Sequence, residues 1–373
     1  TSAEAGYRQV AIGNDDLKWE ENESTNLGVD VEFMGGAANF VLDVYQRDSN
    51  NLLFNPPLPA AAGQAQAPIV NVGEVRNRGF DASLGFRGQF GNGITWGVDL
   101  NGAAYTNEII RIDGEREFFF GPITTRTATQ SVTINEIGSP IGAFYGLEQV
   151  GFFQSQQEID QLNAQAQQAT GNPDAEYQAG AAPGRFRFAD TNGDGVVNAS
   201  DRTVIGSPHP DFTSSLNLSL GWGSWDFAAN LFGSFGNEIF DIQKEFYVFA
   251  YFPQNVRADL LTDSWTESNQ DAKYPRLDVT DTYSQAPSSF HVEDGSYVRL
   301  RSLQVGYALP DNLVGGINNA RVYIRGENLF TITGYDGLDP SLPASAINNA
   351  GMDVRDQAHR DRGHGLRGHD HRL

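Results

Sequence analysis

The stretch GFDASLGFRGQFGNGITWGVDLNG, residues 79–102, decides the fold class. Every second residue from Phe80 to Phe86 is apolar, and so is every second residue from Ile94 to Leu100, with polar residues or glycine between them. A period of two residues indicates an extended strand whose two faces meet different surroundings. The stretch therefore predicts two antiparallel strands joined by a tight glycine-rich turn.

Three further pairs of segments carry the same alternation. These predicted strands cover residues 25–33, 39–47, 214–222, 225–235, 297–309 and 320–330. So many segments with period two indicate an all-β protein. The chain also alternates in the length of its connections. The short ones lie near residues 35, 92, 223 and 314, and the long ones at 48–73, 108–209, 236–296 and 332–353.

This alternation in length predicts the topology. In an up-and-down antiparallel sheet all short turns lie at one end and all long loops at the other, as in outer-membrane barrels. Trp96, Trp222 and Trp225 lie beside short turns, where an aromatic girdle would meet the membrane interface. We therefore expect a transmembrane β-barrel with long extracellular loops. A soluble β-sandwich with uneven loops is the alternative, although loops of tens of residues are uncommon in compact domains.

Composition excludes several other classes of protein. The chain has 373 residues and no cysteine, which excludes a disulfide scaffold and a cysteine-ligated metal site. Its formal net charge of −22 argues against nucleic acid as a partner. No apolar run is long enough for a transmembrane helix, and the first ten residues do not resemble a signal peptide. We expect either a protein that is not exported or an internal piece of a longer chain.

The stretch DTNGDGVVNASD, residues 190–201, has the spacing of a calcium-binding loop. In EF-hand register the ligands are Asp190, Asn192, Asp194, the carbonyl of Val196, and Asp201. Ca²⁺ takes six to eight oxygen ligands, which this spacing would bring together. The last position holds Asp where the strict pattern has Glu, so an ion-free turn is the alternative. We expect Ca²⁺ in a structural role.

Signals for catalysis are poor. No nucleophile elbow, P-loop or HExxH motif occurs, and His209 and His291 are isolated in the sequence. We therefore expect that the protein is not an enzyme.

Other residues have the chemistry to contact a solute or to pack within the loops. The acidic residues on the polar faces of predicted strands are Asp30, Asp43, Asp81 and Asp99. They would line a solute path or simply face water. The aromatic runs 118–120 and 246–252 would stack on sugars, contact a lid protein or pack within their own loops. The Gln/Ala-rich segment 154–170 predicts a short helix with Ile159 and Leu162 as its apolar face.

Six stretches carry a family resemblance. They are NDDLKWEENESTNLGVDVEF (14–33), NVGEVRNRGFDASL (71–84), GSPIGAFYGLEQVGFFQSQQEI (138–159), DTNGDGVVNASDRTVIGSPHPDFTSSLNLSL (190–220), DGSYVRLRSLQVGYALP (294–310) and ARVYIRGENLFTITGYDGLDPSL (320–342). In this order they resemble the motifs of SusC/RagA-type TonB-linked outer-membrane proteins, which are TonB-dependent receptors.

The resemblance implies the C-terminal part of a barrel of about 22 strands, with about eight of them in residues 1–353. The family's plug domain and TonB box would lie before Thr1 and are absent. The resemblance further implies a place in the cell outer membrane, in contact with lipid. It implies import of oligosaccharide or peptide fragments, with a SusD-like surface lipoprotein as a lid and energy from the TonB complex. The alternative function is that of a secreted, calcium-stabilised β-sandwich binding module.

Residues 354–373, VRDQAHRDRGHGLRGHDHRL, depart from the family pattern. They contain no aromatic residue, do not alternate in polarity, and are rich in Arg and His. Basic side chains facing lipid cost about 2–4 kcal/mol each near the midplane of the bilayer. We expect this aberrant tail to be an out-of-frame translation product. The alternative is a genuine His-rich metal-binding tail.

Overall fold

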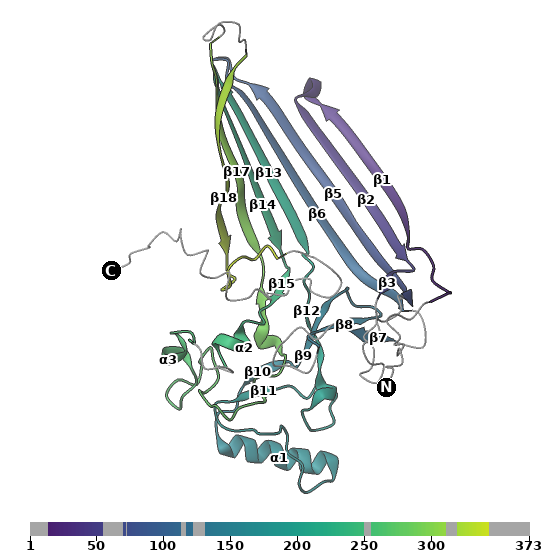
Figure 1. The fold of residues 1–373 in the computed structure, drawn as a ribbon, viewed down its shortest axis with the longest axis vertical. Helices are drawn as coiled ribbons and strands as arrows, with labels where there is room; N and C mark the ends of the chain where they lie inside the picture. Colours follow the sequence, from purple (N-terminus) through teal and green to yellow (C-terminus); the bar gives the residue numbers. More distant parts are fainter. Residues whose placement is uncertain are drawn as a thin grey trace, which may run out of the picture.

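A computed structural model describes residues 14–54, 70–71, 73–112, 117–121, 131–249, 255–310 and 319–342. Its main feature is an antiparallel sheet of eight long strands in sequence order (Figure 1). The strands are β1 (Glu21–Phe33), β2 (Ala38–Asn50), β5 (Gly73–Gln89), β6 (Thr95–Ile112), β13 (Phe212–Trp222), β14 (Trp225–Phe235), β17 (Tyr297–Ala308) and β18 (Arg321–Thr333). This is the up-and-down order that the connection lengths predict. β1 and β18 form the edges, so the sheet is open and does not close into a barrel. We call this eight-stranded sheet the wall.

The register of the strands gives the sheet one apolar and one polar face. Partners in adjacent strands share a face, and neighbours along a strand point to opposite faces. One row across four strands consists of Leu84, Leu100, Leu216 and Leu231. The next row, on the opposite face, includes Ser83, Asn101 and Ser215. The period-two pattern of the sequence therefore corresponds to two continuous surfaces.

The strands reverse at their short-turn end within a few residues. β1 and β2 are joined by the 3₁₀ turn η1 (Met34–Gly36). Between β13 and β14 only two residues intervene, and Gly223 adopts a positive φ of 57° there. Such tight hairpins favour glycine because other residues are strained at positive φ.

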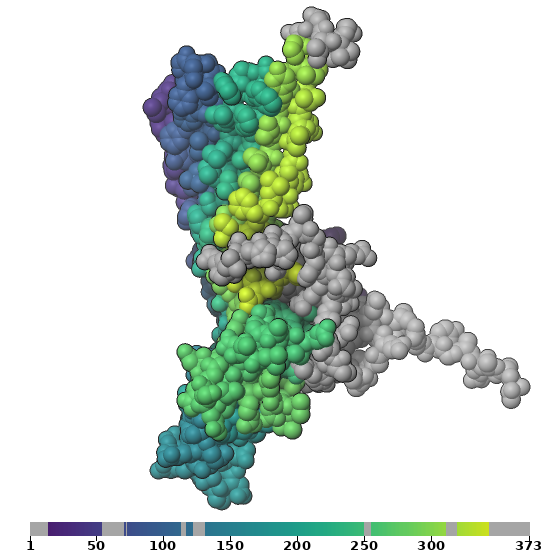
Figure 2. Space-filling view, turned by 90° about the vertical axis from the view of Figure 1, so that its left-hand side faces the viewer, coloured from purple at the N-terminus to yellow at the C-terminus, as the bar shows by residue number. Residues whose placement is uncertain are grey.

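Two long connections fold together into a separate body beyond the other end of the sheet (Figure 1, Figure 2). The first contains β7 (Phe118–Phe120), β8 (Thr133–Glu136), β9 (Ala143–Gly146), β10 (Gln149–Phe152), α1 (Gln156–Thr170), β11 (Phe186–Phe188), η3 (Ala199–Asp201) and β12 (Thr203–Gly206). The second contains β15 (Glu238–Phe240), α2 (Lys244–Tyr247), α3 (Leu260–Asp263), η4 (Ser289–His291) and β16 (Val292–Asp294). A third connection contributes the short pair β3 (Leu53–Phe54) and β4 (Val70–Asn71).

The hydrophobic core lies in the body and not in the sheet. The largest fully buried aromatic side chains are Phe144, Phe153, Phe186, Phe188, Phe240 and Tyr274. Phe186 is central, with its ring centroid 4.8 Å from that of Phe290 and 5.4 Å from that of Phe152. The two partners come from different long connections, so the core fastens these connections to each other.

The helix predicted in the Gln/Ala-rich segment is confirmed as α1. Its N-terminus is capped by Ser155, whose side chain accepts a hydrogen bond from the backbone N–H of Glu158, and Gly171 ends it in the left-handed conformation. Ile159 is buried as expected, and Leu162 is half-buried. Among the described residues, no helix is long and apolar enough to cross a bilayer.

The sandwich alternative is wrong. A sandwich needs two sheets packed face to face, but all eight long strands belong to one sheet. The other sheets in the described part of the chain have two to four short strands. Many apolar side chains of the large sheet are exposed, including Leu218, Val322 and Ile324.

Candidate functional site: the polar wall and the body at its end

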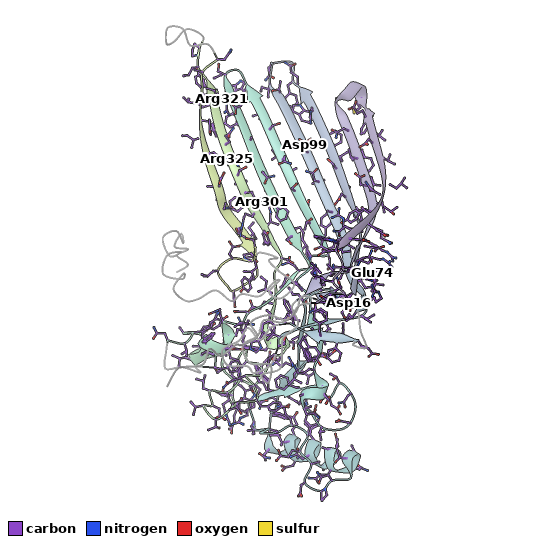
Figure 3. All side chains as sticks on the ribbon, turned by 45° about the vertical axis from the view of Figure 1, so that its right-hand side comes forward. Asp16, Glu74, Asp99, Arg301, Arg321 and Arg325 are labelled. Atoms are coloured by element: carbon purple, nitrogen blue, oxygen red, sulfur yellow. The ribbon has the colours of Figure 1, made fainter. Side chains whose placement is uncertain are left out.

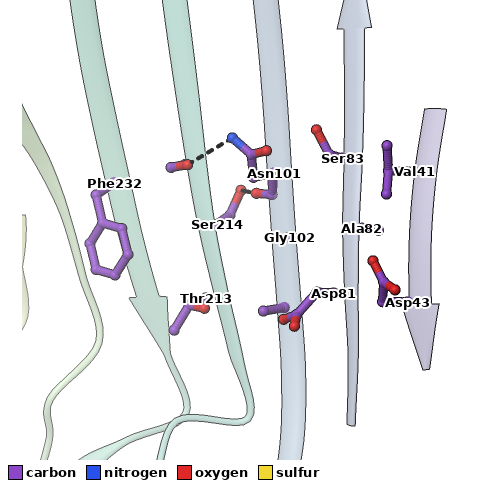
Figure 4. A pocket seen from close by; sticks show the side chains of 12 residues that line it. Val41, Asp43, Asp81, Ala82, Ser83, Asn101, Gly102, Thr213, Ser214 and Phe232 are labelled. Atoms are coloured by element: carbon purple, nitrogen blue, oxygen red, sulfur yellow. Dashed lines mark hydrogen bonds between the residues drawn. The ribbon is translucent and has the colours of Figure 1, made fainter. Parts of the chain in front are cut away.

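The four acidic residues singled out in the sequence share the polar face of the sheet. Asp43 and Asp81 are direct partners on β2 and β5, and they line a shallow hollow of about 240 Å³ (Figure 4). Polar groups of β6 and β13 also line the hollow, and there the amide of Asn101 donates to the hydroxyl of Ser215 at 3.2 Å. Carboxylates directly opposite each other repel unless a donor or cation is near. Asn26 supplies one such donor, 2.9 Å from Asp43.

Charged groups of both signs lie on this polar face. The strands β1 to β6 carry the four acidic residues and Arg87, and the strands β17 and β18 carry Arg301, Arg325 and Glu327. Asp99, Arg301 and Arg325 are labelled in Figure 3. The guanidinium of Arg301 lies 3.5 Å from the ring centroid of Phe232, which lines the hollow. A polar solute beside this wall would therefore meet acidic and basic groups on different strands.

The apolar face carries aromatic side chains at both ends. Trp222 and Trp225 flank the short turn, and the Trp225 ring packs 4.7 Å from that of Tyr307. At the other end of the same two strands, Phe212 stacks on Phe235. The 11 residues of β13, at about 3.3 Å per residue and a tilt of about 40°, span roughly 25 Å. Outer-membrane barrels have an apolar band of about that height between aromatic girdles.

The body is fixed to the polar side of the wall. His209, just before β13, has its Nε2 2.9 Å from the carbonyl of Ile141 and its Nδ1 3.3 Å from the hydroxyl of Tyr105. A small apolar cluster, Val75, Ile109 and Ile112, packs at the same end against Phe119 and Ile141. Burial lowers the pKa of His209. The neutral imidazole therefore fastens the body to strand β6.

The aromatic runs of the loops mostly pack within the body. Phe246, Tyr247, Val248 and Phe249 all join its hydrophobic clusters, whereas residues 250–254 lie outside the described part of the chain. In the other run Phe119 packs against the wall, and Phe118 and Phe120 remain exposed. The prediction of packing within the loops is confirmed for the described residues, except at these two exposed rings.

The predicted calcium loop forms a tightly hydrogen-bonded turn between β11 and β12. The carboxylate of Asp190 accepts from the backbone N–H groups of Gly193, Asp194 and Gly195 at 2.7–3.2 Å. Fully buried Asp201 accepts from Thr191, at 3.0 Å, and from Asn198, at 2.8 Å. Hydrogen bonds of the same kind run from Asp194 to Asn192 and from Val196 to Asp194.

The predicted ligands are thus close in the chain, but their carboxylates serve the loop's own backbone. In the described part of the chain, no three His, Cys, Asp or Glu side chains gather in a way that could hold a metal ion. The three acidic members of the predicted set would need the Asn192 amide and the Val196 carbonyl to complete a hard-cation site. Calcium binding stays a prediction.

The segment of residues 276–280 in the body is held by hydrogen bonds that the sequence does not predict. Asp278 accepts hydrogen bonds from Arg185 at 2.7 Å, from Arg276 at 2.9 Å and from the hydroxyl of Thr280 at 2.7 Å. The hydroxyl of Thr280 and the two guanidinium groups hold the pKa of Asp278 well below its usual range. Arg185 and Asp278 are 93 residues apart, so no local pattern could have paired them.

His291 is a fully buried titratable group of the body. Its ring stacks parallel on Phe240, with the centroids 5.2 Å apart, and Nε2 has no hydrogen-bond partner. Burial, with the nearby Lys244 ammonium, lowers the pKa of His291 to about 3. A neutral histidine in an aromatic cage packs as part of the core.

Residues 2–329 match the β-barrel family described as TonB dependent receptor-like. The chain belongs to this family. It is 31% identical to TonB-dependent receptor P3 of Formosa agariphila, over 91% of this chain and 32% of that protein. It is 24% identical to TonB-dependent receptor SusC of Bacteroides thetaiotaomicron, over 90% of this chain and 31% of that protein. The chain thus spans about a third of the length of the curated relatives that it matches.

A solved structure shares the fold. The structure of the RagAB peptide transporter matches with a TM-score of 0.68 and 23% identity, over 91% of this chain and 34% of that chain. The prediction of an antiparallel transmembrane barrel with long loops at one end is confirmed. The polar face is then the inner, luminal face of this TonB-dependent receptor barrel, and the apolar face is its lipid face. Residues 354–373 lie outside the described residues, and their out-of-frame origin stays a prediction.

Proposed function

We propose that this TonB-dependent receptor acts in the cell outer membrane as the wall of an importer. The observation that carries the proposal is the pairing of the two faces. An apolar band bounded by aromatic residues suits contact with outer-membrane lipid, and a polar face with Asp43, Asp81, Asn101 and Arg301 suits passage of a hydrated solute. Transport, and not catalysis, is the role that such a wall supports.

We infer that import is energised by the TonB complex and that a SusD-like surface lipoprotein works with this chain. Support comes from the family, from the likeness to SusC, and from the fold that the chain shares with the RagAB structure. The body at the end of the long loops would then face the cell exterior, where such a lipoprotein sits. Its long connections would present a folded surface to that partner.

The substrate class in this proposal is a fragment of a glycan or a peptide. The family that the sequence resembles implies both classes, and one solved neighbour is described as a peptide transporter. The acidic and basic groups of the polar face favour a polar solute of either class. The calcium loop, if it binds an ion, would stiffen the body and take no part in transport.

Uptake by cells tests the proposal. The gene of the full-length receptor would be deleted from its host. It would then be restored in two strains, one with an intact TonB gene and one with a disrupted TonB gene. Fluorescently labelled oligosaccharide and oligopeptide pools would then be offered. We expect uptake of one pool to require both the receptor and TonB. Equal uptake of both pools in all strains, or recovery of the receptor in the soluble fraction, would contradict the proposal.

A further inference from the structure

The apolar face of the wall stops abruptly toward the end of the sheet that meets the body. On four neighbouring strands its last apolar row consists of Leu27, Val44, Phe80 and Ala104. Leu27 is 75% exposed and Val44 is 52% exposed, which suits residues that contact lipid. The strands β1, β2, β5 and β6 continue past this row. The membrane boundary therefore lies within these strands and not at their ends.

Beyond this row the same face becomes polar within two residues along each strand, or about 7 Å. The next row consists of Thr25, Gln46, Arg78 and Thr106, and the row after it consists of Glu23, Asp48, Arg76 and Glu108. Both rows point outward, as Phe80 does, because residues two apart on a strand share a face. In an outer-membrane barrel this height belongs to the lipid headgroups.

Arg76, in the outer of these two rows, already has anionic partners. Its Nε is 2.6 Å from one carboxylate oxygen of Asp48, and a terminal nitrogen lies 3.3 Å from the other oxygen and 3.2 Å from Glu74. Glu74, labelled in Figure 3, marks the end of the sheet where this cluster lies. Two carboxylates thus use the guanidinium of Arg76, and a further anion would have to compete with them.

Arg78, in contrast, is oriented without being neutralised. Its Nε donates to Oε1 of Gln46 at 2.9 Å, and the amide of Gln46 donates to Asp48 at 2.7 Å. Arg78 is exposed, and among the described residues no carboxylate forms an ion pair with it. Its terminal N–H groups can therefore bind an oxyanion in the two-pronged geometry that a guanidinium favours. Because Gln46 holds the side chain beforehand, less entropy is lost on binding.

The neighbours of Arg78 decide which anion fits. Phe80 lies two residues away on the same face, so a molecule whose apolar chains cover Phe80 brings its headgroup to Arg78. Glu23 and Glu108 lie in the next row outward and would repel a negative charge placed there. The site therefore favours a molecule whose charge sits directly at the end of its apolar chains. A lipid with a phosphate on its acyl-bearing unit has this arrangement, whereas a soluble anion gains nothing from Phe80.

We propose that Arg78 and Phe80 form a binding site for an anionic lipid of the outer leaflet. The phosphate of this lipid lies on the guanidinium of Arg78, and an acyl chain packs on the ring of Phe80. The inference rests on the proposed function, which places the long-loop end of the wall at the cell exterior. A lipid bound there fixes the height of the wall in the membrane, next to the strands that carry the body.

The lipid retained by the purified receptor tests this site. The tagged full-length receptor would be extracted from outer membranes in mild detergent, and its bound lipids would be quantified by mass spectrometry. Arg78→Gln removes the charge, and we expect it to retain about fivefold less phosphate-bearing lipid, because charge-assisted hydrogen bonds are lost. Arg78→Lys keeps a charge without the planar fork and should fall between the two; it replaces Arg78→Gln if that variant does not assemble. The matched control is Arg87→Gln, on the same strand but on the luminal face, which should retain lipid as the unchanged receptor does.

Vesicles of defined composition separate the possible sources of the anion. The unchanged receptor and Arg87→Gln should melt several degrees higher in phosphatidylcholine vesicles that contain phosphatidic acid than in phosphatidylcholine alone, and Arg78→Gln should not. An equal gain in all variants, or the same gain from inorganic phosphate alone, overturns the lipid site and leaves the proposed function intact. Loss of the gain in Arg87→Gln instead of Arg78→Gln would reverse the two faces of the wall and overturn both.

Discussion

The sheet and the body use apolar side chains in opposite ways. In the body, Phe186 and Phe240 are fully buried and surrounded by other rings. In the sheet, Leu218 and Ile324 point outward and remain exposed. The body therefore carries its own hydrophobic core in water, whereas the sheet needs lipid to cover its apolar face.

The polar groups differ in the same sense. The ion pair of Arg185 with Asp278 is largely covered by the body, with both side chains 13% exposed, and links its two long connections. On the luminal face, the pair of Arg87 with Asp99 is longer, at 3.7 Å, and more open. The body thus behaves as a folded domain, and the wall as a boundary between lipid and water. Substitutions in the core of the body, on the lipid face and on the luminal face are therefore expected to have different effects.

The largest effect is expected in the core of the body. Phe186→Ala removes the ring that joins the two long connections, and such truncations cost about 3–5 kcal/mol. Hydrogen exchange on the full-length receptor in detergent should show the body opening while the strands stay protected. Leu218→Ala, on the lipid face, is the control and should leave the body unchanged. Loss of protection in the strands with Phe186→Ala would show that wall and body are not separate units.

The next effect distinguishes the two faces of one strand. Leu218 and Ser219 are neighbours on β13 and point to opposite faces. Leu218→Arg places a charge in lipid near the midplane, at about 2–4 kcal/mol, and should reduce the fraction of heat-resistant barrel on gels. Ser219→Arg faces the lumen and should assemble normally. If both variants assemble equally well, the assignment of the faces is wrong.

A smaller effect follows from the pKa of His291. Between its ordinary pKa of 6.5 and its folded pKa of about 3, the unfolded chain binds a proton that the folded body does not. Stability is therefore lost as pH falls through this range, at about 1.4 kcal/mol per pH unit, or roughly 2 kcal/mol at pH 5. His291→Phe should keep the stacking on Phe240 and lose this part of the pH dependence. Melting of the body at pH 7 and pH 5 measures the difference, and identical slopes would contradict the burial of a neutral imidazole.

The sequence predicts the wall better than the body, for a physical reason. Each strand carries its own period-two pattern, and hairpin partners are neighbours in sequence, so Leu84 opposite Leu100 follows from local information. The sequence pattern does not predict residues 73–78 of β5 or 103–112 of β6, because Arg76, Arg78 and Glu108 interrupt the apolar row at the end of the sheet that meets the body. The body depends on pairs such as Phe186 with Phe290, which only the folded chain brings together.

The candidate sites show the same limit. The shared face of Asp30, Asp43, Asp81 and Asp99 follows from strand parity alone. The ion pair of Arg185 with Asp278 does not, because 93 residues separate its two partners in the sequence. The spacing of the loop at 190–201 predicts a cation, but hydrogen bonds to its own backbone use the same oxygens, so spacing alone cannot decide occupancy.

The smallest effect concerns that loop. If it binds calcium, millimolar Ca²⁺ should slow hydrogen exchange of residues 186–205, with a dissociation constant of about 10⁻⁴ to 10⁻³ M, as in extracellular modules. Asp190→Ala should abolish this dependence and leave the strands unaffected. Asp174→Ala, at another exposed acidic position of the body, is the control. Absence of any calcium-dependent protection would favour the ion-free turn.

Labelling of single cysteines in intact cells tests the central claim, that the wall crosses the outer membrane with the body outside. Residues 1–373 contain no cysteine, so Asn92→Cys at a short turn and Asn172→Cys beside α1 each add a single thiol to this part of the receptor. A membrane-impermeant maleimide should label Asn172→Cys in intact cells, and Asn92→Cys only after the outer membrane is permeabilised. Labelling of Asn92→Cys in intact cells, with Asn172→Cys protected, would contradict the account.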